Sequence, residues 1–237
     1  MLVTGASRGL GLAIATRLAA DGFTVTAVAR KPSEALEEVI AATQGAIRFE
    51  PFDLTEVDVI ADFVRRLKRE HGPLYGLVNN AGIGTSGLLT NMSQAQIEAL
   101  IRLNTLSPIL LTKYVVRQMM VAGEGRVVNM ASVIASTGFN GLSVYGATKA
   151  SLVGFTRSLA REVGRVGVTV NAVAPGFIET ELTSGVDGGG LEKIAGRSAL
   201  GRLAVAEDVA AAVSFLMSDG ARNVTGTVLT VDAGGTA

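Results

Sequence analysis

Three residues in the middle of the chain have the chemical types needed to move a proton to or from an oxygen atom. Tyr145 and Lys149 lie four residues apart, a spacing that places both side chains on one face of a helix. A phenol with a pKa near ~10 is a weak base at neutral pH, but a neighbouring ammonium favours its phenolate form. Ser132 can donate a hydrogen bond to an oxygen whose charge changes. The set predicts acid–base chemistry at a carbonyl or carbinol oxygen, although Tyr-x-x-x-Lys alone also fits a buried tyrosine beside a surface lysine.

A glycine-rich turn opens the chain. The segment TGASRGLG, residues 4–11, follows an apolar start, and residues 10–20 then have the apolar spacing of a helix. A strand, turn and helix in this order direct backbone N–H groups and a helix dipole at a phosphate. Gly5 permits the tight turn, Gly9 lets the backbone approach a pyrophosphate, and Gly11 lets the helix lie close to the sheet. The segment therefore predicts a dinucleotide site.

Strands and helices alternate along the whole chain, a pattern that implies parallel βαβ units. We expect strands at about 1–4, 23–29, 46–50, 74–78, 125–130, 167–173 and 227–231. We expect helices at about 9–20, 33–42, 56–70, 93–120, 143–164 and 206–217. The prediction is an α/β fold: a single Rossmann-type, doubly wound domain over residues 1–237, with a seven-stranded parallel sheet and helices on both faces.

Composition excludes several classes of function. Twenty-one basic and 21 acidic residues cancel without forming a basic block, so we expect no nucleic-acid partner. The absence of cysteine excludes disulfides and thiolate catalysis and fits a reducing compartment. No apolar run reaches the ~20 residues that span a membrane, and no signal peptide is visible. We therefore expect a cytoplasmic protein that does not enter a membrane.

The motifs together resemble those of the short-chain dehydrogenase/reductase family, in that family's order and over the whole chain. The resemblance rests on TGASRGLG with its GxxxGxG spacing, Asn79-Asn80-Ala81-Gly82, Asn104, Ser132, Tyr145-x-x-x-Lys149 and Pro175-Gly176. It implies hydride transfer between a nicotinamide and the carbonyl carbon of a substrate.

The resemblance also implies roles for single residues. Ser132 would orient the carbonyl oxygen, and Tyr145 would donate the proton in the reducing direction. Lys149 would lower the pKa of Tyr145 and contact the nicotinamide ribose, and Asn104 would hold a water that links Lys149 to solvent. We expect no metal, because hydrogen bonds from Ser132 and Tyr145 can polarise the carbonyl.

Further residues would surround the cofactor by the same resemblance. Asp53-Leu54 would bracket the adenine, Asn79, Ala81 and Gly82 would line the ribose, and Ile178 and Thr180 would meet the carboxamide. The expected cofactor contacts are Gly5, Ser7, Arg8, Gly9, Leu10, Gly11, Arg30, Asp53, Leu54, Asn79, Ala81, Gly82, Tyr145, Lys149, Pro175, Gly176, Ile178 and Thr180.

The end of the second strand indicates which cofactor is used. A site that prefers NAD usually has an acidic residue there to hold the ribose 2′-hydroxyl. The matching residue is Ala29, with Arg30 and Lys31 after it, and Arg8 can approach the same region. A guanidinium holds phosphate in a bidentate manner, so we expect NADP(H).

The sequence constrains the identity of the substrate less than that of the cofactor. LVNNAGI, SLAREV and APGFIET resemble bacterial 3-oxoacyl-[acyl-carrier-protein] reductases, which makes an NADPH-dependent carbonyl reductase the leading hypothesis and a 3-oxoacyl thioester its candidate substrate. Where such reductases carry cations that dock the carrier protein, this chain has Gly123 and Val166. Arg126 and Arg165 lie nearby and are the candidates to substitute for those cations. The alternatives are a dehydrogenase of a small secondary alcohol, polyol or sugar, and a non-catalytic NADPH sensor. A sensor would not need all four catalytic residues.

Two expectations concern larger features. Residues 178–204 have little periodicity and contain the triplet Gly188 to Gly190, so we expect a mobile lid that closes over substrate. We also expect a homotetramer, because Leu152, Phe155 and Leu159 recur on one face of a long helix. The resemblance implies two-fold contacts through the long helices at about 93–120 and 143–164 and through the C-terminal run Gly226 to Ala237.

Overall fold

The chain forms one parallel sheet of seven strands. The computed structural model describes residues 1–84, 87–178 and 188–237, with the backbone alone for 188–191. The strand order is β3-β2-β1-β4-β5-β6-β7, and all neighbours pair in parallel. The strands are β1 (Leu2–Thr4), β2 (Val25–Ala29), β3 (Ile47–Pro51), β4 (Gly76–Asn79), β5 (Gly125–Met130), β6 (Val168–Pro175) and β7 (Val228–Val231).

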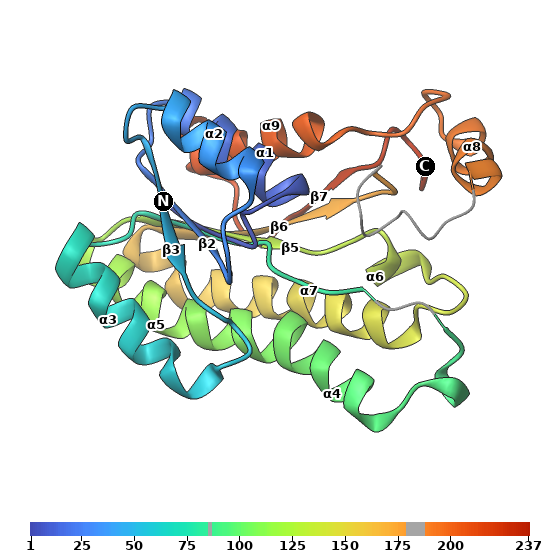
Figure 1. The fold of residues 1–237 in the computed structure, drawn as a ribbon, viewed down its shortest axis with the longest axis horizontal. Coiled ribbons are helices and arrows are strands. Elements are labelled where there is room, and N and C mark those ends of the chain that lie inside the picture. Colours follow the sequence, from blue (N-terminus) through green and yellow to red (C-terminus); the bar gives the residue numbers. More distant parts are fainter. Residues whose placement is uncertain (85–86, 179–187) are drawn as a thin grey trace.

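Helices cover both faces of the sheet. Figure 1 shows α1, α2 and α9 on one face and α3, α4, α5 and α7 on the other. The helices are α1 (Gly9–Ala20), α2 (Glu34–Ala42), α3 (Ile60–His71), α4 (Gln94–Ile101), α5 (Ser107–Ala122), α6 (Ile134–Thr137), α7 (Ser143–Val163), α8 (Gly188–Arg197) and α9 (Ala206–Met217). None of these helices, as far as the structure describes them, is long and apolar enough to cross a membrane. The predicted fold class is confirmed.

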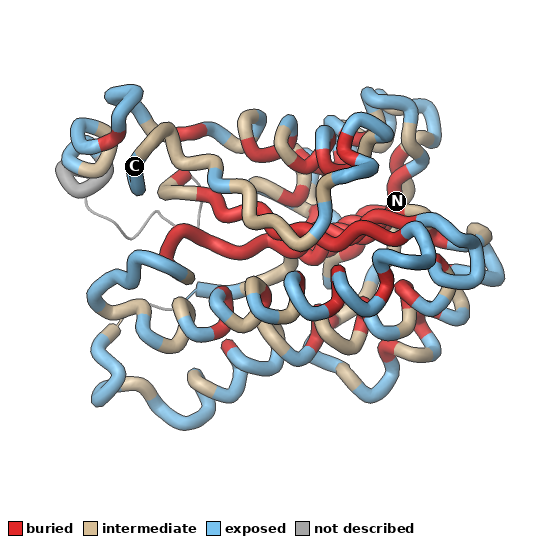
Figure 2. The backbone as a smooth tube through the Cα atoms, turned by 180° about the vertical axis from the view of Figure 1, so that it is seen from behind, coloured by how far each residue is buried: buried red, intermediate tan, exposed pale blue. Residues whose placement is uncertain are grey.

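Burial explains why the central strands are rich in apolar residues. Every residue of β6 is buried, and so is every residue of β1, because helices cover both faces. In Figure 2 the strands form a buried band between two helical layers whose outer turns are exposed. The sheet reverses its order between β1 and β4, and such a switch point leaves a crevice at the carboxyl ends of the strands. The fold thus provides a ligand site between β1 and β4.

The helix predicted at 93–120 is interrupted. A π-helical turn, Arg102–Leu106, separates α4 from α5. Pro108 stands in the first turn of α5, and it has no N–H to donate to the carbonyl four residues earlier, which belongs to Asn104. This missing bond accounts for the looser turn, and π-turns of this kind are frequent at functional sites.

The segment predicted as a lid contains a helix. Residues Gly188–Arg197 form α8, so the glycine triplet begins a helix instead of an irregular stretch. Leucine, glutamate, lysine and alanine follow the triplet, and these are good helix formers. Residues 179–187, including Thr180, lie outside the described part of the chain, so lid closure stays a prediction.

Candidate active site

The structure brings Ser132, Tyr145 and Lys149 together at the carboxyl edge of the sheet. Ser132 lies two residues after β5, and Tyr145 and Lys149 lie one turn apart on α7. The hydroxyl of Ser132 hydrogen bonds to the phenol of Tyr145. The Lys149 Nζ lies 5.7 Å from the centre of the Tyr145 ring. The three catalytic candidates therefore lie close together in the structure.

The pKa of Tyr145 differs from the expectation. Burial raises the pKa of the phenol above its ordinary value, and the hydrogen bond with Ser132 offsets only part of that rise. We expected the Lys149 charge to lower this pKa, but Nζ faces the ring and burial dominates. The phenol is therefore protonated at neutral pH, which suits a proton donor in the reducing direction.

Lys149 is a buried cation. Its side chain is only 5% exposed, and Nζ donates a hydrogen bond of 2.8 Å to the carbonyl of Met130 at the end of β5. Burial lowers the pKa of the ammonium from 10.5 to about 8. At neutral pH the lysine is thus still charged, but its proton is held weakly.

Asn104 links two parts of the site. The amide nitrogen donates to the Ile83 carbonyl (2.8 Å) and to Thr148 Oγ1 (3.2 Å), and the amide oxygen accepts from the Ile83 N–H (2.9 Å). Gly82 lies between Asn104 and Lys149, since a Cβ on Gly82 would be 3.2 Å from Asn104 Oδ1 and 3.6 Å from Lys149 Nζ. Asn104 therefore joins the loop after β4 to α7, and its role in holding a water stays a prediction.

The glycine-rich turn has the geometry expected of a phosphate site. A Cβ on Gly11 would lie 2.1 Å from the Gly5 carbonyl oxygen, so a larger residue would push α1 away from the turn. Gly9 has a φ of +54° and open space where a Cβ would be, so its backbone can be approached closely. Ser7 and Leu10 belong to the same turn, and Leu10 packs partly against the core.

Two residues that sequence reasoning did not select hold this turn in place. Thr4 Oγ1 accepts hydrogen bonds from the N–H groups of Asn80 and Ala81, each at 3.0 Å. The Asn80 side chain donates to the carbonyls of Thr4 (2.8 Å) and Gly5 (3.2 Å). These bonds join β1 to the loop after β4 across the switch point. The available signal was a polar residue at the end of β1, Thr4, and another directly after β4, Asn80.

Three expected cofactor contacts point their side chains into the protein. The Asn79 amide donates to Thr112 Oγ1 and to Asn129 Oδ1, both at 2.8 Å, and the residue is 4% exposed. Leu54 and Ile178 are buried in the two hydrophobic clusters that flank the sheet. The Asn79 side chain is thus engaged inside the protein, and the expected contacts of Asn79, Leu54 and Ile178 with the cofactor stay predictions.

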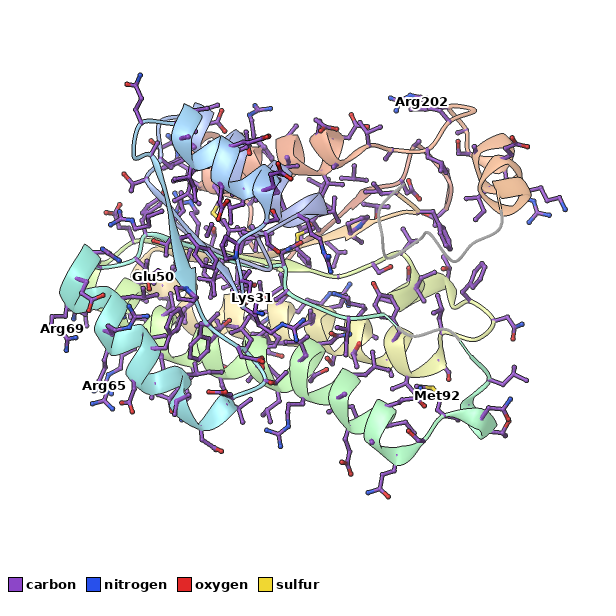
Figure 3. The ribbon with its side chains drawn as sticks, in the orientation of Figure 1. Lys31, Glu50, Arg65, Arg69, Met92 and Arg202 are labelled. Atoms are coloured by element: carbon purple, nitrogen blue, oxygen red, sulfur yellow. The ribbon has the colours of Figure 1, made fainter. Side chains whose placement is uncertain are left out.

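The edge of the site near β2 is cationic. β2 ends at Ala29, and Arg30 and Lys31 follow it as exposed residues, with Lys31 lying just beyond the strand in Figure 3. Burial raises the pKa of Asp53, but hydrogen bonds from Thr55 and the charge of Arg30 outweigh it, so this pKa lies below its ordinary value. Arg8, in the glycine-rich turn, is exposed as well. These residues fit a dinucleotide that carries an additional phosphate on its ribose.

The opposite edge is closed by the end of β6. Gly176 donates its N–H to the Val231 carbonyl at 2.9 Å, and a Cβ on Gly176 would lie 2.6 Å from the Asp232 Cβ. Pro175 is buried, and its carbonyl accepts from the Val133 N–H at 3.0 Å. Pro175 and Gly176 thus hold the segment after β6 beside the segment that carries Ser132.

One group of potential metal ligands lies outside this site. Glu50, Glu70 and His71 approach one another where β3 meets the end of α3. Arg66 binds both carboxylates, at 2.8 Å from Glu50 and 3.1 Å from Glu70, and so supplies the positive charge that a cation would bring. The group is therefore an ion-pair cluster.

A doubly wound sheet with this turn and a serine–tyrosine–lysine set defines a dinucleotide-dependent oxidoreductase. The family profile described as "Enoyl-(Acyl carrier protein) reductase" matches residues 5–236. The chain belongs to the short-chain dehydrogenase/reductase family.

Curated relatives and solved structures agree with this assignment. The 3-oxoacyl-[acyl-carrier-protein] reductase FabG of Escherichia coli (strain K12) is 40% identical over 235 residues, which cover 98% of this chain and 95% of the relative. The FabG of Pseudomonas aeruginosa is 42% identical over 237 residues, with the same coverage. A gluconate 5-dehydrogenase from Burkholderia cenocepacia, solved in complex with NADP and tartrate, superimposes with a TM-score of 0.93 at 28% identity, covering 99% of this chain and 94% of the other.

Replacing Tyr145 with phenylalanine should abolish turnover and leave cofactor binding nearly intact. The variant removes the proton donor but keeps the ring, and general acid–base groups typically contribute ~10²–10⁴-fold. Steady-state rates and a cofactor titration measure the two effects. Tyr114→Phe, on α5, is the matched control and should keep full activity. Activity of Tyr145→Phe within a few-fold of wild type would reject the assignment.

Replacing Lys149 with methionine should stabilise the protein while inactivating it. The pKa of Lys149 is lower in the folded protein than its ordinary 10.5, so the buried ammonium costs stability below pH 8, and that cost disappears as pH rises toward 10.5. The gain should be on the order of 1–3 kcal/mol at pH 7 and should shrink above pH 8.

Thermal unfolding at several pH values measures this gain. The control is Lys113→Met, because Lys113 is exposed on α5 and its replacement should leave the melting temperature nearly unchanged. A lower melting temperature of Lys149→Met at pH 7 would contradict the account.

Proposed function

We propose that this protein is an NADPH-dependent carbonyl reductase that transfers hydride to a ketone, with 3-oxoacyl thioesters as its substrate class. The observation that carries the proposal is the hydrogen-bonded Ser132–Tyr145 pair beside the buried Lys149, at the carboxyl edge of a dinucleotide-binding sheet. Relatives about 40% identical over nearly the whole chain are named 3-oxoacyl-[acyl-carrier-protein] reductases, which supports the substrate class.

Each residue of the site has a separate role in the proposed reaction. A reduced nicotinamide, when bound, supplies the hydride to the carbonyl carbon. Tyr145 donates its proton to the carbonyl oxygen as negative charge develops there. Ser132 donates a hydrogen bond to the same oxygen and so orients the carbonyl. The Lys149 ammonium stabilises the phenolate that remains on Tyr145 until a proton returns from solvent.

The choice of NADP(H) rests on charge at the end of β2. A ribose 2′-phosphate is dianionic and needs cations, whereas a 2′-hydroxyl is usually held by a carboxylate. This chain has Ala29 at that place and Arg30, Lys31 and Arg8 around it. Two related gluconate 5-dehydrogenase structures contain NADP, which supports the same choice.

Use of an acyl carrier protein stays a prediction. Arg126 cannot dock a partner, because it is 7% exposed, lies over the Tyr75 ring at 5.4 Å and donates to the Gly125 carbonyl at 3.0 Å. The expectation that it substitutes for a docking cation is therefore wrong. Arg165 is exposed and remains a candidate. A thioester could also reach the site as a small molecule.

A second candidate is a dehydrogenase of a sugar acid or polyol. The structural similarity to two gluconate 5-dehydrogenases, each with a TM-score of 0.93 and with 28% and 33% identity, favours it. The sequence identity to the 3-oxoacyl reductases is higher, so we rank it second. A non-catalytic sensor is the least supported alternative, since the catalytic set is complete.

The cytoplasmic location stays a prediction.

A substrate panel tests the proposal. A 3-oxoacyl thioester on coenzyme A, the same acyl group on acyl carrier protein, and gluconate with the oxidised cofactor are each followed at the nicotinamide absorbance band. We expect kcat/KM to be highest for a thioester with NADPH. Faster oxidation of gluconate than reduction of either thioester would favour the second candidate.

Replacing Ala29 with aspartate should shift cofactor preference toward NADH. The new carboxylate accepts from a ribose hydroxyl and repels a 2′-phosphate. Titration of both cofactors into each protein gives the ratio of the two dissociation constants. Ala95→Asp adds the same charge to the exposed first turn of α4 and should leave that ratio unchanged. An unchanged ratio in Ala29→Asp would show that the ribose lies elsewhere.

We also propose a homotetramer, in which exposed apolar residues of the segment predicted as a helix at 93–120 contribute to the subunit contact. Leu152 and Leu159 are 2% and 8% exposed and pack within their own subunit, so these two residues do not supply that contact. Apolar side chains are instead exposed at Ile101 (47%), Leu106 (38%) and Phe139 (50%). Exposed apolar side chains of this kind are candidates for burial against another subunit.

The mass in solution tests this assembly. Light scattering should return about four times the chain mass of 24.3 kDa. Ile101→Lys should reduce that mass, whereas Val59→Lys, at the exposed N-cap residue of α3, should not. A wild-type mass equal to one chain would overturn the proposal.

A further inference from the structure

One serine hydroxyl joins two segments that are 26 residues apart in the sequence. Ser33 is the N-cap of α2, and its Oγ accepts a hydrogen bond of 3.1 Å from the Leu36 N–H. The same hydroxyl donates its own hydrogen to the carbonyl of Ser7, in the glycine-rich turn. An N-cap needs only the accepting half of this arrangement. The donated bond is therefore an additional connection between α2 and the turn.

Both connected segments carry cations next to the connection. Arg8 directly follows Ser7, and Arg30 and Lys31 stand three and two residues, respectively, before Ser33. The strands hold the near ends of these segments, because the Ala6 N–H donates to the Val28 carbonyl at 3.2 Å. Farther along the two segments, the hydrogen bond from the Ser33 hydroxyl to the Ser7 carbonyl connects them directly.

We infer that Ser33 is a positioning residue that determines cofactor specificity, because it holds the Arg30–Lys31 segment beside Arg8 so that both can meet one 2′-phosphate. The inference rests on the proposed use of NADP(H). Loops that are already fixed lose less conformational freedom when they bind, so the affinity for the phosphate rises. A cofactor without the 2′-phosphate gains nothing from this arrangement. Ser33 should thus affect NADPH and leave NADH almost unchanged.

Three substitutions of Ser33 distinguish its hydrogen bond to Ser7 from its capping of α2. Ser33→Ala removes both functions. Ser33→Gly removes the hydroxyl but keeps a residue that helices tolerate well at the N-cap, so α2 should persist. Ser33→Thr keeps the hydroxyl and serves as the conservative variant. Ser93→Ala is the matched control, because Ser93 caps α4 through the Gln96 N–H at 3.3 Å and has its other hydrogen bonds within the same capping box.

The measurement is the dissociation constant of NADPH and of NADH for each protein. We expect Ser33→Ala and Ser33→Gly to weaken NADPH by about tenfold and NADH by less than about twofold, the effect of losing one hydrogen bond. Ser33→Thr should retain the wild-type ratio. Ser93→Ala should lower the melting temperature and leave the ratio unchanged.

The outcomes distinguish this inference from the cofactor proposal. If wild-type protein prefers NADPH but Ser33→Gly keeps the full preference, Ser33 does not determine specificity. If both cofactors weaken equally, Ser33 acts only as a structural cap, and the inference fails too. If wild-type protein shows no preference for NADPH, the proposed cofactor itself is wrong, and the inference falls with it.

Discussion

The burial of the Lys149 ammonium is the constraint on which the rest of the site depends. A cation removed from water is stable only where protein groups replace its hydration, and here the Met130 carbonyl does so at 2.8 Å. That carbonyl lies at the end of β5, so α7 must lie close against this strand. The same placement brings Tyr145 next to Ser132, which follows β5 by two residues. Pairing the buried ammonium with the Met130 carbonyl therefore requires the same position of α7 that places Tyr145 beside Ser132.

A chain of buried polar side chains maintains that position. Asn129, in β5, accepts from Asn79 in β4 and donates to Thr156 on α7, both at 2.8 Å. Asn79 also donates to Thr112 on α5, so two strands and two helices are joined. Unpaired groups at this depth would be strongly destabilising, which makes the network specific for one arrangement. It lies below the site and contacts the same two elements, β5 and α7, that hold Lys149.

Patterns in the sequence predicted the sheet, the glycine-rich turn and the proximity of the catalytic residues, because these depend on local periodicity and spacing. Features that depend on tertiary packing were missed. The π-turn at 102–106 arises from one proline, and a helical pattern cannot show it. Leu152 and Leu159 are equally apolar whether they pack inside a subunit or against a neighbouring one, and the structure shows that both are buried within the subunit. The hydroxyl of Ser33 contacts a turn 26 residues away, which no local pattern reveals.

The pKa of Lys149 is the most direct test of this account. Nuclear magnetic resonance of lysine labelled at the ε-carbon follows the titration of each ammonium separately, in the wild-type protein without cofactor. The account predicts that one lysine signal titrates at about pH 8, and that this signal is missing from the Lys149→Met variant. A Lys149 signal that titrates near its ordinary value of 10.5 would show that the ammonium is hydrated, and it would contradict the buried charge at the centre of the account.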